Sequence, residues 1–208
     1  MTADRFERIG NNLSADFVNT VYSPNHAEGS LRSAKDVVDF LVASSALTVK
    51  EAAALRRSLA DPAVAQHFLA RAVQVRSAVT DALEAIESKR ALDDSSLGIL
   101  NAILETDAGF ERLEHRRAAS YALAYHRIRT DATSALAPVA RDTARLLAMP
   151  NSAVRRCAGE GCVRHFYDDS RTGRRRWCDM ANCGNRAKAA AFARRHREPH
   201  RFIPGSQP

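Results

Sequence analysis

Hydrophobic residues recur at helical spacing through most of the first 150 residues. The longest run begins near Pro62 and ends near Arg90, and its apolar positions are Phe68, Leu69, Ala72, Val75, Val79, Leu83 and Ile86. Steps of three and four residues place these side chains on one face of a single amphipathic helix. The same spacing predicts helices within residues 33–47 and 48–61, and further helices from about 95 to 105 and from about 137 to 149.

Polar residues at the starts of two of these segments support the assignment. Ser33 and Asp36 resemble a capping box, and Thr48 and Glu51 have its S/T-x-x-E spacing. In a capping box each side chain accepts a hydrogen bond from a backbone N–H of the first turn that otherwise has no partner. Pro138 is compatible with the last helix, because proline is tolerated in a first turn.

One segment of this first part follows a different period. In residues 111–127, "ERLEHRRAASYALAYHR", large apolar side chains alternate with polar or small ones around Leu113, Tyr121, Leu123 and Tyr125. Alternation with a period of two is typical of strands, so a small β-hairpin is predicted here. The first part of the chain is therefore expected to be mainly α, with one hairpin.

The character of the chain changes near "AMPNSAVRR", where Pro150 and Asn151 end the helical pattern. Residues 151–208 hold 13 lysines and arginines against 5 acidic residues, a net charge of +8, which leaves 18 against 19 for residues 1–150. The two parts are predicted to be domains: 1–150, helical and nearly neutral, and 151–208, basic and cysteine-bearing. The last stretch, "REPHRFIPGSQP", is expected to be frayed.

All four cysteines lie in the basic part, as two pairs with the same C-x4-C spacing: Cys157 with Cys162, and Cys178 with Cys183. Zinc prefers four soft ligands, and a pair two to four residues apart can hold one edge of the ion. We therefore expect one zinc ion per chain. Disulfides are an alternative, but the start "MTADRFERIGNN" lacks the hydrophobic core of a secretion signal. Iron in a four-thiolate site is a second alternative.

The zinc is expected to be structural, because a closed four-cysteine shell leaves no ligand position for a substrate. His165 has C-x-x-H spacing with Cys162, but four thiolates make a fifth ligand unnecessary, and we expect a partly exposed histidine near the site. The sequence has no Gly-rich phosphate loop and neither a G-x-S-x-G nor an H-E-x-x-H motif. A non-enzyme is predicted.

Around the cysteines the sequence predicts a knuckle, a hairpin and a helix, the parts of a treble-clef-like zinc finger. Gly159 and Gly161 permit a tight first knuckle. Residues 163–178 suggest two short extended runs around a turn at residues 170–173. The alanine-rich "NRAKAAAFARRHR" is a strong helix former that ends before Pro199, with Phe192 expected to pack inward.

The tetrapeptide from Cys183 to Arg186 is CGNR. Together with the four cysteines, "FYDDS" and "RRWC", it makes residues 157 to about 197 similar to the CGNR zinc finger of bacterial stress-induced transcription regulators. Upstream, "IGNNLSADFVNTV" resembles the entry segment of the ABATE domain, which precedes this finger in the same family. The resemblance implies an ABATE-like domain at 1–150, a CGNR-like finger at 151–208, and DNA-associated regulation.

The charge of the finger independently indicates a phosphate-bearing partner, and DNA is the one we expect. The candidate DNA-binding residues are Arg171, Arg174, Arg175, Arg176, Arg186, Lys188, Arg194 and Arg197. Some of them could instead neutralise the zinc thiolates, Arg186 above all because it follows the last cysteine. Asn185 is expected to cap the helix or brace the knuckle, and Trp177 to cover the metal.

The first domain offers one candidate input site. Asp16, Asn19 and Thr20 are polar residues interleaved with apolar ones, so they could bind a small-molecule effector or could simply start the fold. A cytoplasmic location is expected, since no apolar run approaches the ~18 residues of a membrane span. A homodimer is also considered, because regulators commonly bind paired half-sites.

The charge of the finger and the family resemblance together predict a DNA-binding transcription regulator with a structural zinc finger, in which the N-terminal domain could sense a ligand. The alternative from another class is a zinc-dependent protein-interaction module or an RNA-binding protein.

Overall fold

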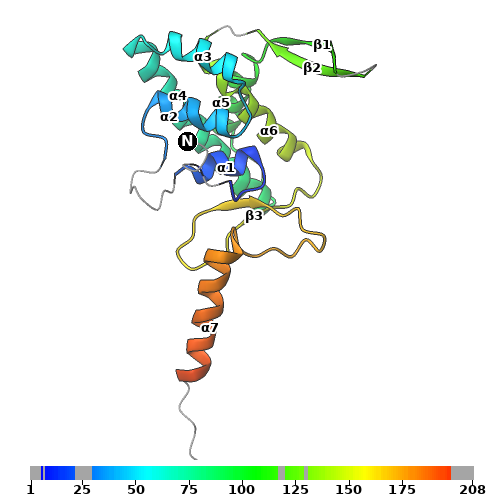
Figure 1. Cartoon of the computed structure of the whole chain (residues 1–208). Helices are drawn as coiled ribbons and strands as arrows, with labels where there is room; N and C mark the ends of the chain where they lie inside the picture. Colours follow the sequence, from blue (N-terminus) through cyan, green and yellow to red (C-terminus); the bar gives the residue numbers. More distant parts are fainter. Residues whose placement is uncertain (1–5, 7, 22–29, 117–119, 129–130, 198–208) are drawn as a thin grey trace, which may run out of the picture.

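A computed structural model describes residues 6, 8–21, 30–116, 120–128 and 131–197, without the side chains of Arg127 and Arg197. A helical body occupies the first part of the chain, and a small finger lies against one end of it (Figure 1). The body contains α1 (Leu13–Asn19), α2 (Ala34–Ala43), α3 (Val49–Ser58), α4 (Pro62–Ser88), α5 (Asp94–Leu104), the short 3-10 helix η1 (Thr133–Leu136) and α6 (Ala137–Ala148). The predicted helices are confirmed.

Helix α4 is the centre of the helical body. It contacts α1, α2, α5 and α6, and its inward side chains include Phe68, Val75, Val79 and Leu83, each with no exposed surface. These are positions that the helical period predicts. Every one of them is apolar, so burying this stripe is the main force that gathers the shorter helices around α4.

The helix starts follow the capping pattern. Thr48 and Glu51 form a complete capping box at the start of α3, while Ser33 caps α2 by accepting from the N–H of Asp36. The carboxylate of Asp36 accepts from the N–H of Arg32.

The predicted hairpin is present as β1 (Gly109–His115) and β2 (Tyr121–Arg127), paired antiparallel with Leu113 opposite Leu123. It projects away from the helical body (Figure 1).

The finger contains β3 (Val154–Arg156), β4 (His165–Tyr167), a π-helical turn η2 (Met180–Gly184) and α7 (Asn185–Arg197). Strands β3 and β4 pair antiparallel on either side of the first cysteine pair. The hairpin predicted around residues 170–173 is therefore misplaced. Those residues do form a turn, in which the N–H of Gly173 donates to the carbonyl of Ser170, but residues 174–177 form no strand.

The finger and the helical body share an apolar interface. Val154 is 4% exposed and belongs to the core of the body, and Tyr167 packs against the same core. Strand β4 contacts α1, and β3 contacts α4. Helix α7 leaves the body and extends away from it (Figure 1). None of the helices in the described part of the chain is long and apolar enough to cross a membrane.

Candidate metal centre and its basic surroundings

The four cysteines converge at one point of the finger. Their Sγ atoms all lie within 4.8 Å of one another, and two neighbouring pairs are separated by 3.7 and 3.8 Å. Tetrahedral zinc with Zn–S bonds of about 2.3 Å requires sulfur atoms ~3.8 Å apart. A disulfide would bring two of them to about 2.05 Å, and all four thiols are free. The cluster therefore fits one structural zinc ion, held by Cys157, Cys162, Cys178 and Cys183.

The electrostatics of the cluster also favour a bound cation. The N–H groups of Cys178 and Gly159 donate to the Sγ of Cys157. Burial raises the pKa of Cys157, but these donors outweigh it and hold that pKa below its ordinary value. Burial and the neighbouring thiols raise the pKa of Cys178 instead. Four thiolates can coexist here when a divalent cation compensates their charge.

Local backbone geometry fixes the cysteines. Gly161 has φ of +70°, a conformation that favours glycine, and allows the first knuckle to turn back within four residues. A side chain at Gly159 would come within 3.1 Å of the Sγ of Cys183. The guanidinium of Arg186 donates to that same sulfur at 3.5 Å, which is the neutralising role considered from the sequence.

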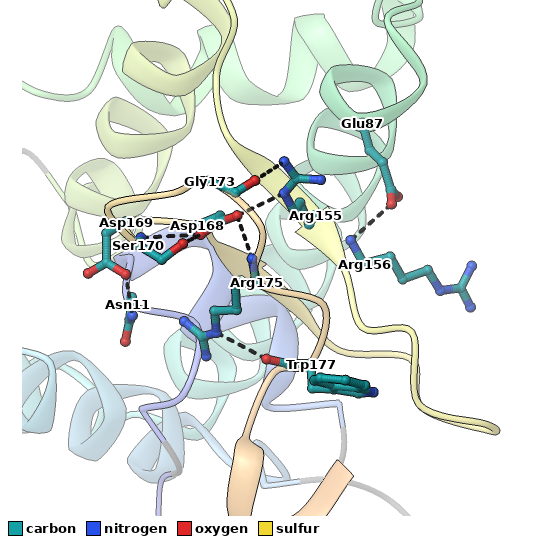
Figure 2. A network of polar contacts seen from close by, with 10 residues as sticks. All are labelled: Asn11, Glu87, Arg155, Arg156, Asp168, Asp169, Ser170, Gly173, Arg175 and Trp177. Atoms are coloured by element: carbon teal, nitrogen blue, oxygen red, sulfur yellow. Dashed lines mark hydrogen bonds and ion pairs between the residues drawn. The ribbon is translucent and has the colours of Figure 1, made fainter. Parts of the chain in front are cut away.

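Asp168 organises the loop between the two cysteine pairs (Figure 2). Its carboxylate accepts hydrogen bonds from the hydroxyl of Ser170, the N–H of Arg175 and the guanidinium of Arg155. Burial raises the pKa of Asp168, but these donors and the charge of Arg155 bring it below its ordinary value. This network gives a physical reason for the aspartate and serine of "FYDDS". Sequence reasoning assigned no role to Asp168 or Arg155.

Arg175 requires a correction to the predicted DNA contacts. Its guanidinium donates to the carbonyl oxygens of Ile9, Trp177 and Cys178, and it lies 4.4 Å above the centre of the Phe166 ring. A guanidinium engaged by three carbonyls braces the second cysteine pair, and we remove it from the set of phosphate contacts.

His165 also differs from expectation. It is 2% exposed instead of partly exposed, and neither ring nitrogen has a hydrogen-bond partner. Burial lowers its pKa and so favours the neutral form of the ring. The reason for its burial is that β4 packs against α1 and pairs with β3, which contacts α4; these long-range contacts are not encoded by the C-x-x-H spacing.

Residues 9–21, the entry segment at the start of the first domain, form hydrogen bonds with the finger. The amide of Asn19 makes two bonds with the backbone of His165, donating to its carbonyl and accepting from its N–H, both at 2.9 Å. The carbonyl of Gly10 accepts from the N–H of Tyr167 at 2.7 Å, and Asn11 donates to Asp169 at 3.0 Å. The polar residues of "IGNNLSADFVNTV" therefore join the two parts of the chain.

The three candidate effector residues all have partners within the chain. Asn19 holds β4, the hydroxyl of Thr20 donates to the carbonyl of Phe17, and Asp16 accepts from the N–H of Gly10 at 2.7 Å. Neither of the two grooves described below includes these residues. Effector binding by Asp16, Asn19 and Thr20 stays a prediction.

Asp16 gives the interface a pH dependence. Burial raises its pKa from 3.8 to about 6, with the Gly10 N–H and the charges of Arg8 and Arg175 opposing the shift. Below about pH 6 the folded protein keeps a proton that the unfolded chain releases, so this contribution to stability is lost as pH rises through that value. Compared with Asp16→Asn, the natural protein is expected to lose about 1 kcal/mol between pH 5 and 7.

Urea unfolding of the zinc-loaded proteins at pH 5, 6 and 7 measures this difference. Effects of pH on the metal site are common to both proteins and cancel. Asp94→Asn, in the exposed first turn of α5, is the matched control and should follow the natural protein. A difference between Asp16→Asn and the natural protein that is constant over this range would refute the assignment.

Two basic grooves lie beside the metal centre. The first, the finger groove, has a volume of about 390 Å³ and is lined by Ala158, Gly159, Glu160, Arg176, Trp177, Cys183, Arg186, Ala187, Ala190 and Arg194. The second, the junction groove, has a volume of about 440 Å³ and is lined by residues of α4 and β3 that include Lys89, Arg155 and Arg156. Ala158 and Arg176 line both grooves, so the two are adjacent.

Helix α7 carries the remaining candidates on a surface open to solvent. Arg186, Lys188 and Arg194 are exposed. Phe192 is also exposed, at 58%; its ring lies against that of His196 at an angle of 54° and does not pack inward as predicted. The DNA contact predicted for Arg197 involves a side chain that lies outside the described part of the chain. Arg171 and Arg174 are exposed in the loop after β4, and Arg176 lies 5.2 Å above the Trp177 ring.

The smaller predicted roles near the metal are supported. Trp177 is half-buried against the cysteine cluster. Asn185 donates to the carbonyl of Ala181 and so braces the turn that precedes α7.

Comparison with known families agrees with this geometry. A family model described as CGNR zinc finger matches residues 153–196. A second, ABATE, described as "Putative stress-induced transcription regulator", matches residues 11–150. No curated protein matches the chain.

Proposed function

This chain belongs to the ABATE family, whose description is "Putative stress-induced transcription regulator", and we propose that it regulates transcription by binding duplex DNA through its zinc finger. The observation that carries the proposal is the finger groove, where Arg176, Arg186 and Arg194 line one hollow beside the metal centre. Phosphate oxygens bind such clusters of guanidinium groups.

The shape of the finger supports a duplex as the partner. Helix α7 projects from the body, and its alanines at 187 and 190 line the groove between the arginines. Small side chains let a helix approach a polar surface closely, and the major groove of B-DNA admits an α-helix. The projecting helix α7 would enter the major groove of the DNA. Arg176 and Arg186, near the start of this helix, would contact the flanking phosphates.

The contact surface extends beyond the finger itself. The junction groove adds Arg156 from β3 and Lys89 from the end of α4, and Figure 2 shows the Arg156 side chain extended away from the Asp168 network. Since the two grooves are adjacent, a phosphate backbone could follow both. The proposed contacts are Arg156, Arg171, Arg174, Arg176, Arg186, Lys188, Arg194, Arg197 and Lys89.

The zinc has a structural role in this proposal. It would hold the knuckle and the start of α7 in place and so fix the directions of Arg176 and Arg186. We propose no catalytic activity, because four cysteine ligands close the coordination shell. The input of the regulator is a proposal as well: an effector would act on the helical domain, which the entry segment links to the finger.

A charge-deletion series tests the DNA contacts. For the triple variant Arg176→Ala, Arg186→Ala, Arg194→Ala we expect weaker binding to duplex DNA. Each lost phosphate contact makes the slope of log K against log salt less negative by about 0.9. The magnitude of the slope should therefore decrease by about 2 to 3. The measurement is fluorescence anisotropy over a range of KCl concentrations, with zinc content determined on the same samples.

The matched control removes three exposed charges from the helical domain, with Arg32→Ala, Lys50→Ala and Arg57→Ala. It should bind DNA like the natural protein. If the finger variant keeps its zinc and its full salt slope, the finger groove is not the DNA surface. Preference for single-stranded RNA, or a DNA-insensitive complex with an acidic protein, would replace the proposed function with one of those alternatives.

A further inference from the structure

The hairpin β1–β2 exposes most of its large side chains to solvent. All seven residues of β1 are exposed, and its side chains include Phe110 at 50% and Leu113 at 64%. On β2, Tyr121 and Leu123 are 55% and 63% exposed. A two-stranded ribbon without a third strand or a covering helix is marginally stable in water. This hairpin therefore has the form of half of a larger sheet.

The pairing within the hairpin determines which backbone groups of β1 are free for a further strand. The N–H of Arg116 donates to the carbonyl of Ser120, and the N–H of Ile128 donates to that of Ala108. Because bonded pairs alternate along an antiparallel ladder, the even-numbered residues of β1 bond to β2. The N–H and C=O groups of Glu111, Leu113 and His115 point toward the open edge.

The charges on this edge are complementary to themselves. When two copies of β1 pair antiparallel about Leu113, Arg112 of each copy lies opposite Glu114 of the other, and Glu111 lies opposite His115. Leu113 meets its own equivalent as a bonded pair, so the backbone alternation is also satisfied. Arg112 and Glu114 then form the non-bonded type of pair, in which opposing side chains lie closest.

Neighbouring registers lack this complementarity. Centring the pair on Arg112 places two arginines opposite each other, and centring it on Glu114 places two glutamates there. Like charges directly opposite destabilise a strand pair. The charges on β1 thus favour one register of self-pairing and disfavour its neighbours.

We propose that the open edge of β1 pairs antiparallel with the same edge of a second copy of this chain, centred on Leu113. The pairing makes a four-stranded sheet across a two-fold axis. Leu113 and Leu123 of both copies, together with the Tyr121 side chains, then lie on one continuous face, since Glu111, Leu113 and His115 share the side of the sheet that carries Tyr125, Leu123 and Tyr121. This proposal does not rest on DNA binding.

The edge of β2 is a poorer candidate for self-pairing. Self-pairing about Leu123 would place alanine opposite alanine and tyrosine opposite tyrosine, so no charged pair would set the register. Tyr125 on β2 is also held by the body, because its hydroxyl donates to the carbonyl of Asp107 and Arg141 lies 4.5 Å above its ring.

Charge reversal at the edge tests the proposal. The natural zinc-loaded protein should shift from monomer to dimer with rising concentration in sedimentation or light-scattering measurements. Strands of seven residues bury less than the ~1,200 Å² of a standard interface, so dissociation in the micromolar range is expected. Arg112→Glu and Glu114→Arg should each raise the dissociation constant about tenfold or more. Combining both substitutions in one chain should restore dimerisation.

The control for the change in net charge is Lys50→Glu on the exposed face of α3. This variant should dimerise like the natural protein. Restoration by the double variant separates edge pairing from damage to the hairpin, including loss of the 2.8 Å contact between Glu114 and His126. A natural protein that stays monomeric at several hundred micromolar overturns the proposal, as do single variants that dimerise like the natural protein.

Cysteine cross-linking tests the register. At the two-fold axis, the Cα atoms of a bonded antiparallel pair lie about 5.5 Å apart, within the range of a disulfide. Leu113→Cys should therefore cross-link two zinc-loaded chains under oxidised glutathione. Glu111→Cys should not, because its copies lie four residues apart along the strands, about 13 Å. The reverse result, or efficient cross-linking of both, refutes the proposed register.

Discussion

Cys183→Ser is expected to abolish stoichiometric zinc binding and to unfold the finger while the helical body stays folded. Cys183 is 3% exposed and holds the start of α7, and its sulfur neighbours Cys178 and accepts from Arg186. Structural zinc sites contribute on the order of 10 kcal/mol to folding, and a small finger has little other core. The core around α4 contains no cysteine, and only Val154 and Tyr167 of the finger take part in it, so the body should stay folded without the metal, although less stable.

Trp177 provides the readout, because it is the only tryptophan of the chain and packs against the cysteine cluster. Its fluorescence should shift to the red in Cys183→Ser and in the natural protein treated with a chelator. Far-ultraviolet circular dichroism should retain most of its helical signal. A variant with one zinc per chain and unshifted fluorescence would contradict the assignment of Cys183 as a ligand.

Two glycine substitutions provide a graded comparison. A Cβ at Gly159 would press on the Sγ and Cβ of Cys183, so Gly159→Ala should weaken zinc binding. A Cβ at Gly98, on α5, has no atom within 4 Å, and Gly98→Ala should stabilise the body by roughly 0.5 to 1 kcal/mol. Equal zinc affinity in the two variants would mean that the knuckle is looser than the structure describes.

Asn19→Ala has the second largest expected effect, a loss of roughly 2 to 4 kcal/mol in the free energy of unfolding of the zinc-loaded protein. Asn19 is 6% exposed and satisfies both backbone groups of His165. Alanine leaves a buried N–H and a buried carbonyl without partners, each at a cost of about 1 to 3 kcal/mol. Urea unfolding gives the loss, and hydrogen exchange at the His165 amide locates it.

Asn19→Asp refines this test, because the carboxylate can still accept from the N–H of His165 but cannot donate to its carbonyl. Its stability should lie below that of the natural protein and its His165 amide should remain more protected than in Asn19→Ala. If Asn19→Ala unfolds at the same urea concentration as the natural protein, Asn19 does not join the finger to the body.

The parts of the structure that could be predicted from the sequence are those encoded by short-range spacing. The period of apolar residues in 62–90 defines α4, and Thr48 with Glu51 marks the start of α3. The equal C-x4-C pairs predict the metal cluster, because a knuckle positions its two sulfurs through a few residues of local chain.

The features that sequence reasoning missed depend on contacts distant in the chain. Asn19 and His165 are 146 residues apart, so neither their hydrogen bonds nor the burial of His165 has a local signal. The partner of β4 is β3 and not the predicted run after residue 173, because β3 pairs across the knuckle and buries Val154 in the body. Arg175 carries the same charge as Arg174 and Arg176, and only the nearby carbonyls distinguish it.

The most direct test of the central claim is a duplex DNA titration of the zinc-loaded and the metal-stripped protein at two salt concentrations, with competitor DNA present. The account predicts binding that weakens steeply with salt, and whose specific part disappears when the metal is removed and Trp177 fluorescence shifts. Absence of binding at low salt, or equal binding by the stripped protein, would contradict a zinc-organised DNA surface.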